Sequence, residues 1–118
     1  MKKKKFNCPA ELTVHLMGGK WKAVLLYNLR KGPRRFGELR RFSPGISTAT
    51  LTGQLREMED TGLIKRRVIN PLPNLAVEYA LTEKGESLRP ILTAMIRWGI
   101  AHQRDYILGE FGMAIFKK

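Results

Sequence analysis

Residues 43–62 read SPGISTATLTGQLREMEDTG, a turn followed by one amphipathic helix. Pro44 disfavours a helical backbone at the residue before it, and Gly45 permits a sharp bend, so the stretch opens with a turn. Ser47 is a good N-cap, and with Ser47 in that role Ile46 and Leu51 occupy the two positions of a hydrophobic staple. We therefore expect a helix over residues 47–60 that ends at Gly62.

The two faces of this helix differ. Leu51, Leu55 and Met58 recur at i, i+4 and i+7, which predicts a buried stripe. The opposite face carries small and hydroxyl-bearing side chains and a single cation: Ala49, Thr50, Thr52, Gly53 and Arg56. A solvated face is normally rich in Lys and Glu, whereas small and hydroxyl-bearing residues can approach a groove and contact phosphates or base edges. Plain packing is the alternative explanation of this face.

Three shorter helices are expected before the turn. The first covers Pro9–Met17 and opens with a proline, and the second covers Lys20–Lys31 with apolar residues at i, i+3, i+4 and i+8. Gly18-Gly19 and Gly32-Pro33 end them. After a short basic link, Phe36–Phe42 forms the third.

A β-hairpin is expected after the long helix. Leu63–Ile69 and Ala76–Leu81 are β-prone, and the turn-rich residues 70–75 separate them. Ile64, Arg66 and Val68 share one face of the first strand, and Lys65 and Arg67 share the other. Cations at the base of a hairpin suit contact with a sugar-phosphate backbone, or they keep an ordinary edge hairpin soluble.

The last helix is expected to run toward Leu108. Thr82 caps a helical turn, and Pro90 forces a kink or a fresh start near Ser87. The apolar stripe is broader than one neighbour requires: Leu88, Ile91, Leu92, Met95, Trp98, Gly99 and Tyr106. Such a helix either pairs with its own copy in a two-fold dimer or is buried against its own domain.

Charge is strongly positive and unevenly distributed. The formal net charge is +12; residues 1–42 hold 12 Lys and Arg against 2 Glu, a net of +10, and residues 43–118 hold 10 against 8 acidic residues, a net of +2. Such an excess favours a polyanion, either nucleic acid or an anionic membrane surface, although a basic tail on a solvated surface would also produce it. Apolar runs are only a few residues long, so no membrane span and a cytoplasmic protein are expected.

Several specific motifs occur in one order along residues 8–100. They are Cys8-Pro9, Gly18-Gly19-Lys20-Trp21-Lys22, Gly32-Pro33-Arg34-Arg35-Phe36, Leu39-Arg40, Pro44-Gly45-Ile46-Ser47, Leu51-Thr52, Leu55-Arg56, Gly62-Leu63-Ile64, Val77-Glu78-Tyr79, Leu81-Thr82-Glu83-Lys84-Gly85 and Trp98-Gly99. With these motifs the chain resembles the HxlR-type winged helix-turn-helix regulators of bacteria and archaea.

The resemblance implies a mainly α fold with a small β-hairpin (α+β), a winged helix-turn-helix domain over residues 8–108 between a basic tail at 1–7 and a C-terminal tail at 109–118. It also implies a recognition helix in the major groove, a wing on the backbone or minor groove, and repression or activation of a nearby operon. Combined with the residue patterns, it gives these candidate DNA-binding residues: Arg34, Arg35, Ser47, Thr48, Ala49, Thr50, Thr52, Gly53, Arg56, Lys65, Arg66, Arg67 and Asn74. Ala49 departs from the family pattern, in which this position is often larger or basic.

A homodimer through the first and last helices is likewise implied, with an approximately palindromic double-stranded DNA operator as its partner. The candidate dimer residues are Leu12, Leu16, Leu92, Met95, Trp98, Gly99 and Tyr106.

Cys8 is the single cysteine, which excludes an intrachain disulfide and a multi-cysteine metal site. In several members of the family, a cysteine at the corresponding position responds to oxidants or electrophiles. The resemblance therefore suggests Cys8 as a redox sensor, and a small packing residue at a helix start is the alternative.

The sequence offers little for catalysis. His15 and His102 lie far apart in the chain, no glycine-rich phosphate loop follows a strand, and no carboxylate pair stands out. We expect no enzyme, no cofactor and no metal, but a sequence-specific DNA-binding transcription regulator. A non-specific architectural nucleic-acid-binding protein and a protein-interaction winged helix are the alternatives.

Overall fold

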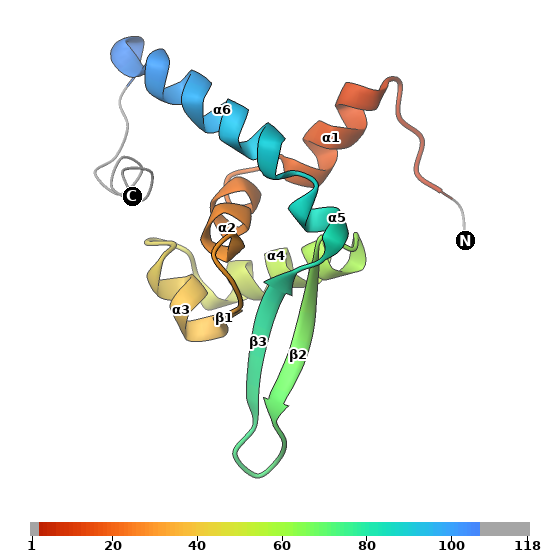
Figure 1. The fold of residues 1–118 in the computed structure, drawn as a ribbon, viewed down its shortest axis with the longest axis vertical. Coiled ribbons are helices and arrows are strands. Elements are labelled where there is room, and N and C mark those ends of the chain that lie inside the picture. The colour runs from red at the N-terminus through yellow and green to blue at the C-terminus, as the bar shows by residue number, and fades with distance from the viewer. Residues whose placement is uncertain (1–2, 107–118) are drawn as a thin grey trace.

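The helices and strands occur in the order expected for a helix-turn-helix that is followed in the chain by a β-hairpin (Figure 1). The computed structural model describes residues 3–106, so the expected tail at 109–118 and the expected helix end at Leu108 lie outside the described residues. The elements are α1 (Pro9–Met17), α2 (Lys22–Leu29), β1 (Arg34–Arg35), α3 (Phe36–Arg41), α4 (Thr48–Asp60), β2 (Ile64–Asn70), β3 (Ala76–Leu81), α5 (Glu83–Glu86), α6 (Arg89–Ala101) and a 3-10 turn over Gln103–Asp105.

The core lies where α2, α3, α4 and the base of the hairpin meet. The predicted stripe of α4 is fully inside it, with Leu51, Leu55 and Met58 at most 1% exposed. Further buried residues include Leu25, Leu26, Leu29, Leu39, Leu63 and Ile64. Burial of each such side chain contributes about 1.5–3 kcal/mol, so this cluster fixes which side of α4 faces inward.

The turn before α4 has the predicted chemistry. The amide of Ile46 donates to the carbonyl of Ser43 at 3.1 Å, and Gly45 takes a φ of 91°, as the third residue of a type II turn must. Ser47 caps the helix, because its hydroxyl oxygen accepts the amide hydrogen of Thr50 at 3.0 Å. Both predicted staple residues, Ile46 and Leu51, are buried in the core.

The predicted hairpin is present and belongs to a larger sheet. β2 pairs antiparallel with β3, with Arg66 opposite Tyr79 and a bulge between Val68 and Asn70. β1 pairs with the other edge of β3, which gives the strand order β1-β3-β2. From the sequence, the residues of β1 are predicted only as a basic link, because two residues show no alternation and this strand forms only by pairing with β3.

The C-terminal helix differs from its predicted length. It makes a fresh start at Arg89 with Pro90 in the first turn, but it ends at Ala101 and does not continue toward Leu108. At that end, Nδ1 of His102 lies 2.9 Å from the carbonyl oxygen of Trp98 and its ring stacks on the indole at 4.1 Å. In Figure 1, α1 and α6 project from one side of the molecule and the hairpin from the opposite side. None of the described helices has the length and apolar character to cross a membrane.

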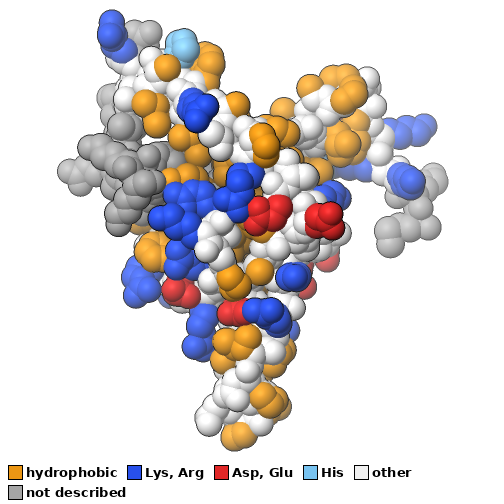
Figure 2. Space-filling model, viewed as in Figure 1, with side chains coloured by type: hydrophobic (Ala, Val, Ile, Leu, Met, Phe, Trp, Pro, Cys, Tyr) orange, Lys and Arg blue, Asp and Glu red, His pale blue; other side chains and the backbone are white. Residues whose placement is uncertain are grey.

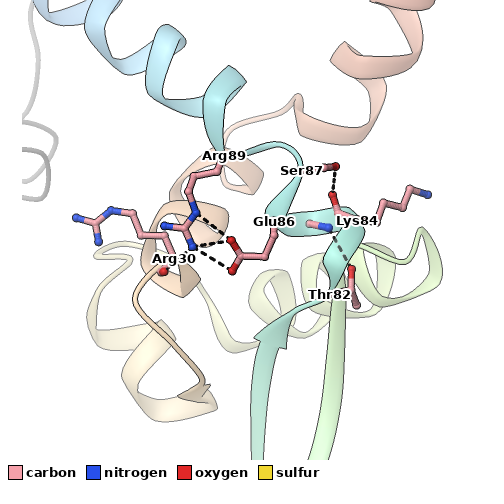
Figure 3. Close-up of polar contacts among 7 residues, drawn as sticks. Arg30, Thr82, Lys84, Glu86, Ser87 and Arg89 are labelled. Atoms are coloured by element: carbon pink, nitrogen blue, oxygen red, sulfur yellow. Dashed lines mark hydrogen bonds and ion pairs between the residues drawn. The ribbon is translucent and has the colours of Figure 1, made fainter.

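A polar junction joins the hairpin to α5 and α6 (Figure 3). The hydroxyl of Thr82 accepts from the amide of Gly85 at 3.1 Å, which confirms the predicted cap, and donates to the carbonyl of Gly62. The guanidinium of Arg89 donates to the carbonyl of Arg30 at 2.7 Å and pairs with Glu86 at 2.7 Å. The start of α6 is thereby fastened to the end of α2.

Gly85 should tolerate no side chain. A Cβ there would overlap the carbonyl oxygen of Leu63, so Gly85→Ala should lower the free energy of unfolding by about 1–3 kcal/mol in urea melts. Gly37 in α3 has no atom within 4 Å of such a Cβ, so Gly37→Ala should instead raise it by about 0.5–1 kcal/mol. Equal effects of the two changes would contradict the tight approach at Gly85.

Candidate nucleic-acid interface

The outward face of α4 is open. Ser47, Thr48, Ala49, Thr50, Gly53 and Arg56 are exposed, and Thr52 is half-buried. No other part of residues 3–106 covers this face. Small side chains and hydroxyls on an open helix can enter a major groove closely, since about 12 Å of groove width admits a helix.

A groove connects this face to the hairpin. It is lined by Thr52, Leu55, Arg56 and Glu59 of α4, Phe36 of α3, Arg66 of β2 and Tyr79 of β3. Arg56 and Arg66 therefore border one hollow although ten positions separate them in the chain. This groove places a cation of the helix and a cation of the wing on one continuous surface.

The predicted cations fall into two groups. Nε of Arg34 donates to the carbonyl of Asn28 at 3.3 Å, and its guanidinium lies 3.6 Å from Glu38. Arg67 pairs with Glu78 across the hairpin. Within residues 3–106, no ion pair involves the exposed Arg35, Arg56, Lys65 or Arg66. This second group is available to a phosphate backbone, whereas the guanidinium groups of Arg34 and Arg67 are held beside carboxylates of the protein.

Glu38 supports the local geometry of Arg34 and Arg35. The backbone amide of Arg35 donates to Oε1 of Glu38 at 3.0 Å, and this bond, with Arg34 and Arg41 nearby, lowers the pKa of the Glu38 carboxyl against the opposing effect of desolvation. The negative charge of Glu38 partly neutralises the positive charge of Arg34. The side chain of Arg35 is exposed and has no ion pair within residues 3–106, whereas that of Arg34 is paired with Glu38.

The hairpin tip carries Asn74, which is exposed, and the amide of Asn70 donates to its backbone carbonyl. The neighbouring Leu72 and Leu75 are exposed as well. Asn74 belongs to the loop between β2 and β3, and Figure 1 shows this loop at the end of the hairpin farthest from the helices.

An ion pair between a buried lysine of α2 and an exposed glutamate of α4 was not predicted from the sequence. Lys22 of α2 is 7% exposed, and its Nζ lies 2.7 Å from Oε1 of Glu57. The hydrogen bond from Lys22 lowers the pKa of the Glu57 carboxyl, against the opposing effect of desolvation. The signal was present, since Lys22, Leu25 and Leu29 follow the helical spacing of a buried stripe.

The candidate dimer residues separate into two sets. Leu12, Met95, Trp98, Gly99 and Tyr106 are exposed, whereas Leu92 is buried in the core and Leu16 packs against it. Leu16 and Leu92 therefore pack within this chain's own fold. Their spacing in the sequence did not show which part of the broad apolar stripe faces inward.

Two apolar grooves flank Met95. One lies between α1 and α6 and is lined by Ala10, Thr13, Val14, Met17, Gly18, Ile91 and Met95, and the other is lined by Ala23 and Val24 of α2 and by Leu92, Met95, Ile96, Gly99 and Ile100 of α6. Figure 2 shows hydrophobic side chains on the arms formed by α1 and α6 and Lys and Arg side chains gathered nearer the middle of that face.

Cys8 stands at the N-terminal end of α1 and is exposed. Its backbone carbonyl accepts the amide of Glu11 at 3.1 Å, while the thiol faces solvent. Cys8 therefore lies outside the core of this chain.

Comparison with known proteins gives a consistent picture. A sequence profile described as HxlR-like helix-turn-helix matches residues 16–108. An uncharacterized HTH-type transcriptional regulator of Bacillus subtilis, YkvN, is 45% identical over 109 residues, 92% of each chain.

Solved structures agree with this match. The redox regulator HypR in its reduced form is 43% identical with a TM-score of 0.78, covering 82% of this chain and 95% of that one, and its oxidized form has a TM-score of 0.75 over 80% and 97% at 45% identity. The reduced transcriptional regulator YodB of B. subtilis is 30% identical with a TM-score of 0.71, covering 86% of this chain and all of that one.

Proposed function

Because this chain belongs to the HxlR-like helix-turn-helix family, it is a DNA-binding transcription regulator, and we propose that α4 reads a defined operator from the major groove. The observation that carries this proposal is the open outer face of α4, which joins the base of the wing through the groove between Arg56 and Arg66. In this arrangement Thr50, Thr52 and Arg56 approach bases or phosphates, and Lys65 and Arg66 hold the flanking backbone.

A homodimer on an approximately palindromic operator is the second part of the proposal. α1 and α6 expose several large apolar side chains, among them Leu12, Met95 and Trp98, and clustered exposed apolar residues commonly mark an interaction surface. A two-fold pairing of these faces would present two copies of α4 to half-sites about one helical turn or more apart.

Redox control through Cys8 is the third part. HypR is described as a redox regulator, and YodB was also solved after diamide treatment. The exposed Cys8 is the single cysteine of the chain, so a disulfide would have to join two copies or cap the thiol with a small molecule. We place this regulator in the cytoplasm with its DNA and assign it no enzymatic activity, in keeping with relatives named as transcriptional regulators.

Arg56 should contribute directly to operator binding. A duplex selected by the wild-type protein from a random-sequence library should bind Arg56→Ala more weakly by about 1–3 kcal/mol in fluorescence-anisotropy titrations. The control Arg97→Ala removes an exposed arginine of α6 and should bind as wild type does. Single-base-pair variants of the duplex then distinguish base reading, which affects one position, from phosphate contact, which weakens all sequences alike.

The same titrations test the alternatives. Equal affinity for selected and random duplexes would indicate a non-specific architectural protein, and no affinity for either would leave a protein-interaction winged helix. Wild-type affinity in Arg56→Ala would remove Arg56 from the interface.

Met95 should lie at the centre of the dimer contact, since it lines both apolar grooves. Sedimentation velocity should find dimers of the wild-type chain and monomers of Met95→Asp, because a buried unpaired carboxylate opposes association. Thr93→Asp adds the same charge elsewhere on α6 and should remain dimeric. A monomeric wild type, or a dimeric Met95→Asp, would contradict this interface.

Oxidation of Cys8 should change operator affinity. Diamide takes one hydrogen from each of two thiols and leaves a disulfide, so treated wild type should run as a covalent dimer on a non-reducing gel. We expect its affinity for the selected duplex to change by at least about tenfold, or about 1.4 kcal/mol, and dithiothreitol to reverse the change. Cys8→Ser should respond to neither reagent; an equal response in that variant, or none in wild type, would exclude the sensor.

A further inference from the structure

One buried cation bridges α1 and α4. Nζ of Lys22 lies 2.7 Å from Oε1 of Glu57 on α4 and 3.4 Å from the carbonyl oxygen of His15 on α1. The side chain of Lys22 is 9% exposed, and that of Glu57 is 46% exposed. The ammonium of Lys22 therefore depends on protein atoms for its hydrogen-bond acceptors, whereas the carboxylate of Glu57 also contacts water.

Both partners of the ammonium are oxygen acceptors, one on the charged Glu57 carboxylate and one on the polar carbonyl of His15. His15 lies in the last turn of α1, where carbonyl oxygens lack helical partners and carry the negative end of the helix dipole. Lys22 thus caps the C-terminal turn of α1 and neutralises a carboxylate of α4 at once. Because water barely reaches it, the ammonium cannot exchange either partner for solvent without a cost in free energy.

The two bridged helices are held very differently. Among the residues of α1, Met17 is the buried one, while Leu12 is 42% exposed and Val14 is 66% exposed. By contrast, α4 buries Leu51 and two further side chains of its stripe in the core. A displacement of α1 therefore disturbs the core mainly at Met17, and it changes the distance from the His15 carbonyl oxygen to the Lys22 ammonium.

We propose that Lys22 is a positioning residue that couples α1 to the recognition helix α4. DNA bound on α4 fixes Glu57 and through Lys22 restrains α1, and by reciprocity a restraint on α1 changes the affinity of α4 for DNA. This inference rests on the proposed function, namely that α4 binds DNA.

Hydrogen–deuterium exchange of the full-length chain, free and bound to the selected duplex, tests the coupling. In wild type, DNA should slow exchange of the α1 amides by at least about fivefold, the lower end of couplings between sites. Lys22→Met keeps an unbranched side chain without the ammonium and should lose this slowing, although α4 is still protected by DNA. Lys22→Arg should retain it, because a guanidinium can donate to both acceptors.

Lys20→Met is the matched control. It removes an exposed lysine two residues away, with the same change in net charge, and should respond as wild type does. If Lys22→Met fails to fold, Glu57→Gln, which removes the charge of a half-exposed partner, should still weaken the α1 response. Sedimentation with and without DNA confirms that the oligomeric state is the same in each comparison.

Each outcome bears on the proposal. Slowed α1 exchange that persists in Lys22→Met or is unchanged in Glu57→Gln would assign the ion pair a structural role alone and overturn the coupling. Wild-type protein that binds the selected duplex without any change in α1 would also overturn it and leave the proposed function intact. Failure of wild type to bind any selected duplex would remove both.

Discussion

Burial of one stripe of α4 determines the rest of this structure. Leu51, Leu55 and Met58 are excluded from water by α2, α3 and the base of the hairpin, so the helix cannot rotate without exposing them. The helix has a period of 3.6 residues, and the same packing therefore turns Ala49, Gly53 and Arg56 outward. The fold holds a small, polar helix face in the open, which is the physical requirement for insertion into a groove.

The cations of the described residues form two groups: those beside a carboxylate or carbonyl of the protein, and those without an ion pair. The guanidinium groups of Arg34, Arg67 and Arg89 each lie beside a carboxylate or carbonyl. At an exposed site, such contacts fix the position of the side chain more than they add to the free energy of unfolding. The exposed Arg56 and Arg66 border one groove instead. The net charge of +12 is therefore spread over cations of different kinds, and of those named here Arg56 and Arg66 lie at one groove.

Local chemistry made much of this predictable. The Ser47 cap, the stripe of α4, the pairing of β2 with β3 and the Thr82 cap all depend on residues close in sequence, and the structure confirms them. The features that were not predicted depend on residues far apart in the sequence. β1 forms only because β3 pairs with it, and Lys22 and Glu57 are 35 positions apart. Periodicity likewise did not reveal that Leu92 faces the core.

Methylation protection of the bound duplex reveals whether the outer face of α4 enters the major groove. Dimethyl sulfate modifies N7 of guanine, an atom that lies in the major groove. We expect two protected major-groove segments whose centres lie one helical turn, about 10 base pairs, or more apart. A fully bound duplex whose guanines are all methylated as in free DNA would contradict it.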